Sequence, residues 1–202
     1  MSLRYYNNET LEAIARKVIS QFDSILLNVP APIPVEIIME KIYGLSLEYH
    51  IIRKNGRVLG ETIFEDALVP IYDRVNNEGY KLIPVKAGTV IIDARLTNNR
   101  SDGRFRYTCA HELAHWILHK YFFTEIGETA AMTKTQRSSE ADKSIEWQAD
   151  RLGSCLLMPK GSVKMAFYHN RSNKNVVDVL AGLFEVSHQA MEIRLNEMRL
   201  LP

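Results

Sequence analysis

The segment His111-Glu112-Leu113-Ala114-His115 determines which fold this chain is expected to adopt. It has the form His-Glu-x-x-His, and residues four positions apart on a helix lie on the same face. Two imidazoles placed in this way can reach one metal ion, and the glutamate between them projects toward the open coordination position. A carboxylate there can take a proton from metal-bound water. The segment therefore predicts a zinc site at His111 and His115, with Glu112 as the general base.

The surrounding sequence predicts a helix over residues 104–122. Its apolar side chains, Cys109 and Leu113 among them, fall on the face opposite the two histidines, because each residue turns the helix by about 100°. The helix is therefore expected to be amphipathic, with the motif on its polar stripe. Cys109 and Cys155 are expected to be small core residues rather than ligands. A chain with only these two cysteines has no disulfide framework, which suits a reducing cytoplasm.

A catalytic zinc ion needs a third protein ligand. His119 continues the four-residue spacing, but it lies about 12 Å along the helix axis from His111, too far for both to bind one ion. Tyr121 and Leu118 stand where the metzincin class has its third histidine and a glycine, which excludes that class. The stronger candidate is Glu146, on a second helix expected over residues 143–157. Three rivals lie in a polar segment, residues 124–142, that is expected to be a loop: Glu125, Glu128 and Glu140.

Glu146 and Asp150 are four residues apart and share one face of that helix. This resembles the Glu-x-x-x-Asp arrangement of gluzincin metallopeptidases. In that class the glutamate binds zinc and the aspartate orients the first histidine of the motif through its other ring nitrogen. Small residues would let the two helices pack closely: Ala110 and Ala114 on the first helix, and Ala149 and Gly153 on the second.

Residues 104–115, the Glu146–Asp150 segment and Leu156-Leu157-Met158-Pro159 together resemble the ImmA/IrrE metallopeptidase-like family. Members typically show Phe-Thr-Leu-Ala-His-Glu-Leu-Gly-His, followed by a Glu-x-Glu-Ala-Asn helix that ends in Leu-Leu-Met-Pro. Tyr107 replaces the usual Phe, Gln148 a frequent second Glu, and Asp150 the Asn. The resemblance implies a small zinc-dependent fold with a short sheet beside the motif helix. It also implies bacterial or mobile-element proteases that act on regulatory proteins.

The order of elements along the chain indicates an α+β fold. Helical periodicity covers residues 11–22, with Asn8 as N-cap, and a short helix over 35–43 ends at Gly44. Asn55-Gly56 is expected to form a hairpin turn between the first two strands. The expected strands cover residues 45–51, 58–64, 67–72 and 89–93, with a turn-rich stretch at 76–79 and a loop at 98–103. The expected helices after residue 160 cover residues 161–168, 175–184 and 187–200.

The expected architecture is zincin-like: a small mixed or antiparallel sheet packed beside the motif helix, with a helical C-terminal part. Residues 1–160 are expected to form the metallopeptidase domain, and residues 161–202 a helical extension packed on the same domain. Two helices of this extension, the second capped by Ser187, resemble a helix-turn-helix. However, the extension has five basic residues against four acidic ones, a poor electrostatic footprint for DNA.

The amino-acid composition argues against several classes of protein. The chain has 202 residues, of which 46% are hydrophobic and 24% charged, as is ordinary for a globular protein. Its formal net charge of +1 argues against a strongly basic nucleic-acid binder. Its apolar runs are far shorter than the roughly 20 residues of a membrane helix, and its polar N-terminus argues against a signal peptide. A cytoplasmic protein is therefore expected, with neither nucleic acid nor membrane as its partner.

The expected activity is that of a zinc-dependent endopeptidase with one zinc ion per chain. His111, His115 and Glu146 would hold the metal, Glu112 would be the general base, and Asp150 would orient His111. Candidates for the donor that stabilises the oxyanion are Tyr121, Tyr168, His169 and His188.

A small protease without a visible inhibitory segment must gain selectivity from docking. The expected docking surfaces are the edge of the strand at residues 89–93 and the helical tail from Asn175. The family resemblance suggests a helix-turn-helix repressor as the protein substrate. The alternative is a non-catalytic regulator that keeps the fold and acts by binding DNA or protein.

Overall fold

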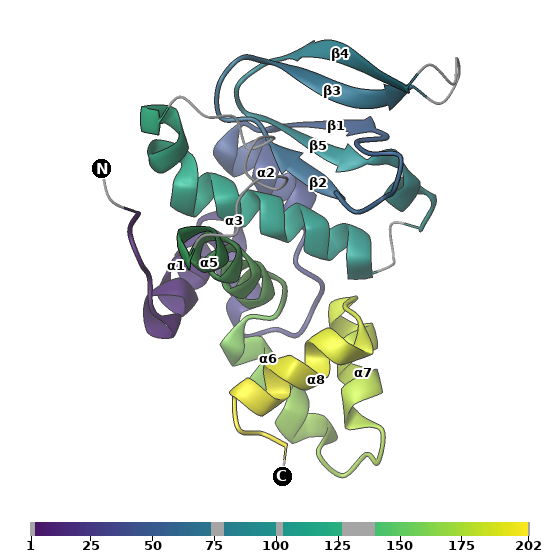
Figure 1. Ribbon diagram of the computed structural model, residues 1–202. Helices are drawn as coiled ribbons and strands as arrows, with labels where there is room; N and C mark the ends of the chain where they lie inside the picture. The colour runs from purple at the N-terminus through teal and green to yellow at the C-terminus, as the bar shows by residue number, and fades with distance from the viewer. Residues whose placement is uncertain (1–2, 74–78, 100–102, 127–139, 202) are drawn as a thin grey trace.

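The structure, a computed structural model, describes residues 3–73, 79–99, 103–126 and 140–201 (Figure 1). It has an α+β fold, as predicted. The long helix α3 (Gly103–Ile126) carries the His-Glu-x-x-His motif and lies between a small sheet and a second long helix, α5 (Glu140–Leu157). Helices therefore cover one side of α3 and strands cover the other.

The N-terminal helices are close to their predicted positions. Helix α1 (Asn8–Asp23) packs against α5, but its N-cap is Asn7, not Asn8, because the Asn7 side chain accepts a hydrogen bond from the Thr10 amide at 2.9 Å. A short 3-10 helix, η1 (Ser24–Leu27), and a proline-rich connector lead to α2 (Val35–Tyr43). Helix α2 ends at Gly44, whose φ of 64° is the left-handed conformation that favours glycine.

The sheet beside α3 is mixed, with the strand order β1-β5-β2. Strand β1 (Ser46–His50) runs parallel to β5 (Thr89–Asp93), and β2 (Gly60–Thr62) runs antiparallel to it. The predicted hairpin at Asn55-Gly56 is therefore wrong, since β1 and β2 lie on opposite sides of β5. The chain does turn at Gly56, with φ of 66°, but the strand that follows pairs with β5.

Strand β5 is the central strand, so the expectation that it offers a docking edge is also wrong. All five of its residues are buried. Val90 and Ile92 point into the main core with α3, whereas Ile91 points into a second, smaller core on the other face. A strand that is apolar on both faces belongs in the interior of a sheet.

The second core is covered by a two-stranded ribbon of β3 (Ala67–Asp73) and β4 (Gly79–Val85). Strand β4 was not predicted, because its sequence places Leu82 beside Ile83 and contains Pro84, and so lacks a clear alternation of apolar and polar residues. Its inner residue Val85 packs with Val69 and Ile71, while Leu68 and Leu82 are exposed on the outer face. Before α3, residues that were expected to begin a loop instead form the 3-10 helix η2 (Ala94–Asn99).

Three helices complete the chain: α6 (Lys160–Asn170), α7 (Val176–Phe184) and α8 (His188–Glu197). Ser187 caps α8 as predicted, since its hydroxyl accepts from the Ala190 amide at 3.2 Å. Buried residues of these helices, Phe184 and Leu195 among them, belong to the same core as α1, α3 and α5. No helix in the described ranges is both long and apolar enough to span a membrane.

The fully buried Arg194 of α8 ties this part of the chain to the rest. Its guanidinium donates to Glu12 of α1 at 2.7 Å and to the carbonyl of Met158, at the end of α5, at 2.9 Å. Glu12 is also close to Arg151 of α5, which pairs with Glu197 of α8. One ionic cluster therefore joins α1, α5 and α8.

Candidate metal centre

The motif helix is more deeply buried than an amphipathic surface helix. The residue surfaces of Glu112, His115 and His119 are only 2%, 5% and 1% exposed. The prediction of an amphipathic helix with an exposed polar face is wrong, because apolar and polar side chains of α3 are both buried where it packs against β2 and α5. Glu112, His115 and His119 therefore lie in a protein interior, where an electrostatic interaction is stronger than in water, whereas the Glu146 and Asp150 side chains are partly exposed.

The structure brings together the three predicted ligands. His111, His115 and Glu146 each offer one ligand atom, and these atoms lie within 4.8 Å of one another. The two histidine Nε2 atoms are 2.9 Å apart, and each lies 3.4 Å from one of the two Glu146 carboxylate oxygens. Donors on one tetrahedral ion, at about 2.05 Å from it, stand about 3.3 Å apart. Two imidazoles and a carboxylate at these separations fit a single zinc ion.

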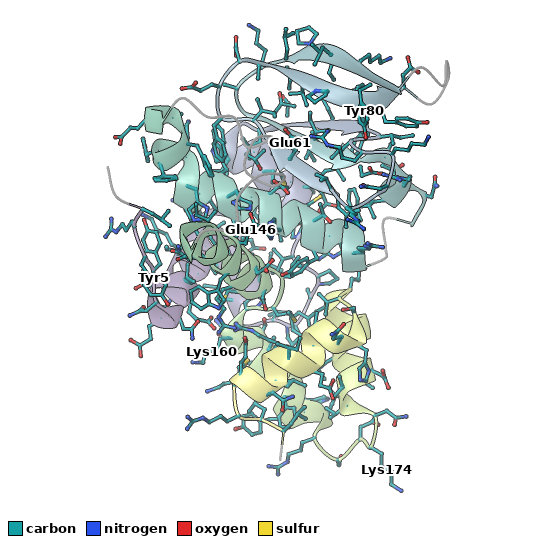
Figure 2. All side chains as sticks on the ribbon, in the orientation of Figure 1. Tyr5, Glu61, Tyr80, Glu146, Lys160 and Lys174 are labelled. Carbon is teal, nitrogen blue, oxygen red and sulfur yellow. The ribbon has the colours of Figure 1, made fainter. Side chains whose placement is uncertain are left out.

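Close packing of α3 and α5 places Glu146 beside the two histidines. Figure 2 shows Glu146 on α5, where this helix lies against α3. A Cβ atom added at Gly153 would lie 3.3 Å from the His111 backbone nitrogen, so the small residue permits this approach, as predicted. Among the described residues, the group that could hold a metal contains none of the three rivals. Glu125 is exposed near the end of α3, Glu128 lies outside the described residues, and Glu140 begins α5. The two ends of the segment 124–142, which was expected to be a loop, are helical and belong to α3 and α5. Its residues 127–139 lie outside the described ranges.

Asp150 contacts the ring nitrogen of His111 that points away from His115. An Asp150 oxygen lies 2.8 Å from His111 Nδ1, and the Tyr107 hydroxyl donates to the same oxygen at 2.9 Å. Burial and the neighbouring Asp150 carboxylate raise the pKa of Tyr107, so its hydroxyl remains a proton donor. Sequence reasoning missed this role of Tyr107. The four-residue spacing from His111 was the available signal, because it places Tyr107 on the same helix face.

The Glu112 side chain contacts two residues of strand β2. The Thr62 hydroxyl of β2 lies 2.8 Å from a Glu112 carboxylate oxygen and donates to it. A Cβ atom added at Gly60 would lie only 2.6 Å from the other oxygen, so only glycine lets β2 approach this closely. Sequence reasoning missed both residues, since they precede the motif by about 50 positions in a different element. They reach Glu112 because β2 is an outer strand of the three-stranded sheet.

His119 is close to the site without facing the ligand atoms. Its Nδ1 lies 3.2 Å from Nδ1 of His115, on the side away from His111 and Glu146. Burial, and to a smaller extent the neighbouring His111, lower the pKa of His119 to about 4. The structure thus agrees with the prediction that His119 is not a third ligand.

The expected oxyanion donors are far less buried. Tyr121, Tyr168 and His169 are exposed, on α3 and α6, and His188 pairs with Asp178 on the surface. In the described part of the chain, none of the four hydrogen-bonds to the histidine pair or to Glu146. Cys109 and Cys155 are buried in the core, as predicted, and form no disulfide.

Comparison with known proteins agrees with this geometry. The profile of one family, described as the IrrE N-terminal-like domain (Peptidase_M78), matches residues 87–196. The match begins just before β5 and runs through α3 and α5 into α8, so it includes His111, His115 and Glu146. No curated protein matches the chain. Because the matched segment is more than half of the sequence, this chain belongs to the Peptidase_M78 family, the peptidases with an IrrE N-terminal-like domain.

Proposed function

We propose that this protein is a zinc-dependent endopeptidase, in which His111, His115 and Glu146 hold one zinc ion per chain. The observation that carries the proposal is the convergence of two imidazole nitrogens and a carboxylate within 4.8 Å, on two helices packed closely enough to hold them. A bound zinc ion supplies a Lewis acid, which lowers the pKa of water and polarises a peptide carbonyl.

The protein's own groups supply the proton transfers and the positioning. Glu112 is the general base: it takes a proton from the attacking water and later returns it to the leaving amine. The hydrogen bond from Thr62 keeps the Glu112 carboxylate in one orientation, and the close approach of Gly60 limits its movement on the other side. Asp150, itself held by Tyr107, fixes the ring of His111 so that its Nε2 faces the metal.

We further propose that the protein substrate docks on the C-terminal helices. A groove of about 350 Å³ runs between α5 and α8, and its lining includes Tyr107, Trp147, Asp150, Ala190 and Ile193. Asp150, which lines this groove, also lies 2.8 Å from Nδ1 of His111, so the groove borders the residues that orient the first proposed ligand. A substrate that occupies it would be oriented before cleavage, which supports a selective peptidase. The family resemblance makes helix-turn-helix repressors the first substrates to test.

We also propose that the chain forms one domain with a helical C-terminal extension and that the protein is cytoplasmic. Residues 161–202 form a helical extension packed on the domain of residues 1–160, and the core shared by the two parts supports this packing. A cytoplasmic location is supported by the two cysteines, Cys109 and Cys155, which are buried and form no disulfide.

The test is a comparison of three purified proteins by elemental analysis and by cleavage of a repressor encoded beside the gene. The wild type should contain about one zinc ion per chain and cleave the repressor at one site. Glu112→Gln should keep the zinc and lose cleavage, because the amide cannot accept the proton, whereas His115→Ala should lose both. Cleavage by Glu112→Gln at the wild-type rate would refute the role of this residue. Repressor binding that survives in His115→Ala, without cleavage in any of the three, would favour a non-catalytic regulator.

A further inference from the structure

The two histidine ligands of the proposed site each use one ring nitrogen toward the metal and the other toward the protein. For His111 the outer nitrogen, Nδ1, faces the Asp150 carboxylate at 2.8 Å. For His115 the outer nitrogen faces another imidazole, Nδ1 of His119, at 3.2 Å. We infer that His119 is a positioning residue: it accepts a hydrogen bond from His115 and thereby directs the other nitrogen of His115 toward the metal.

The direction of this hydrogen bond follows from the proton count of an imidazole. A neutral imidazole carries its proton on one nitrogen and a lone pair on the other. Nε2 of His115 faces Nε2 of His111 and a Glu146 oxygen, so it must keep its lone pair free to bind a cation. The proton of His115 is then on Nδ1, which donates to His119. His119 must accept through Nδ1 and carry its own proton on Nε2.

The surroundings of His119 support an acceptor role and argue against a role of its own in the reaction. The residue is almost fully buried on α3, and the ring of Phe123 lies edge-on to it. Its Nε2 is buried and has no hydrogen-bond partner among the described residues. Buried polar atoms without a partner destabilise a protein, so an apolar side chain of similar size would suit this position better if packing alone decided it. The contact that an apolar side chain could not make is the one with His115.

The inference rests on the proposed metal site and adds His119 as the residue that orients the second histidine ligand, His115. Partners that orient a histidine ligand typically change metal affinity or activity by about 10- to 100-fold when they are removed. Because His119 is neutral and buried whereas Asp150 is an acid at the surface, the two ligands are supported by chemically different partners.

Two substitutions separate hydrogen bonding from packing. His119→Asn keeps an acceptor, since the asparagine Oδ1 stands where Nδ1 of histidine stood, and His119→Leu has nearly the same shape without an acceptor. Both are made in the Glu112→Gln background, so that proteolysis does not interfere. Zinc dissociation constants are measured by competition with a chelator. Thermal unfolding of the metal-free proteins reports on packing, and long-range ¹H–¹⁵N spectra of the zinc-loaded proteins report which nitrogen of His115 carries the proton.

We expect His119→Leu to raise the zinc dissociation constant by about 10- to 100-fold, and His119→Asn to restore most of the affinity. The metal-free His119→Leu protein should unfold at a temperature no lower than that of its parent. The spectra of the parent should show His115 protonated at Nδ1. Equal zinc affinity in the parent and the Leu variant would overturn the inference alone, and so would a proton on Nε2 of His115. Absence of zinc from the parent would instead overturn the proposed function, and this inference with it.

Discussion

Replacing Arg194 by methionine tests whether the C-terminal helices are an integral part of the fold. Methionine can occupy the space of the buried arginine stem, but it cannot bond to Glu12 or to the Met158 carbonyl. Removing one partner of a buried ion pair destabilises a protein by about 3–5 kcal/mol, because the other charge remains buried without compensation. Glu12 keeps a side chain that is 21% exposed and has Arg151 nearby, so we expect a value near 3 kcal/mol.

The assay is urea and thermal unfolding of the metal-free proteins, followed by circular dichroism. For a chain of this size, about 3 kcal/mol corresponds to a fall in Tm of roughly 6–12 °C. Arg171→Met, which removes an exposed arginine of the same extension, is the matched control and should leave Tm almost unchanged. The double variant Glu12→Gln with Arg194→Met should recover part of the loss, since no buried carboxylate is then left without a cation.

The loss should also depend on pH. Burial raises the pKa of Glu12, but its hydrogen bond to Arg194 and the charges of Arg194 and Arg151 outweigh burial, so the folded pKa lies below the ordinary value of 4.5. A lowered pKa contributes stability above pH 4.5 that is lost as the pH falls through the folded value. The difference between wild type and Arg194→Met should therefore be largest near pH 7 and should narrow below pH 4.5. A single cooperative transition with an unchanged Tm in Arg194→Met would show that the ionic cluster does not hold the domain together.

Three further predictions concern the site. Glu146→Ala should abolish tight zinc binding, whereas Glu125→Ala, at an exposed position, should leave it intact. Asp150→Asn should weaken binding or activity by only about 10- to 100-fold, as measured by chelator competition. A larger loss of zinc affinity in Glu125→Ala than in Glu146→Ala would place the third ligand outside α5. Thr62→Val should lower kcat/KM by about 10- to 100-fold at full zinc occupancy, because a hydrogen bond to a charged group is worth about 1.5–3 kcal/mol. Thr108→Val is the control, since the Thr108 hydroxyl donates to the backbone carbonyl of Arg104, and equal rates in the two variants would contradict the role of Thr62. Casein should be cleaved negligibly, as followed on gels, and brisk hydrolysis would refute selective docking.

The residues of the candidate metal centre could be predicted because the relevant signal is local. Four-residue spacing on a helix places His111 with His115, and Glu146 with Asp150, whatever surrounds them. The small residues Ala149 and Gly153 also indicated that the two helices approach closely, and Gly153 does lie against the His111 backbone. An α+β fold with a small sheet, either mixed or antiparallel, beside the motif helix followed from the order of periodic segments and from the family resemblance.

Strand pairing could not be predicted in the same way. The periodicity of residues 45–51 predicts a strand but contains no information about its neighbour, and a turn at Gly56 favours pairing with the next strand along the chain. Burial on both faces instead places β5 in the centre, because Ile91 fills one core while Val90 and Ile92 fill the other. That choice depends on distant segments, including the unpredicted β4, which together supply the second core.

The sequence by itself thus determined which side chains can hold a metal, since helix geometry converts spacing into proximity. Only the tertiary structure decided what orients them. Thr62 reaches Glu112 from a strand about 50 residues earlier, and His119, which spacing had offered as a ligand, lies behind His115 as a hydrogen-bond partner. Both contacts exist because α3 is buried between sheet and helix, where polar groups must find partners within the protein rather than in water.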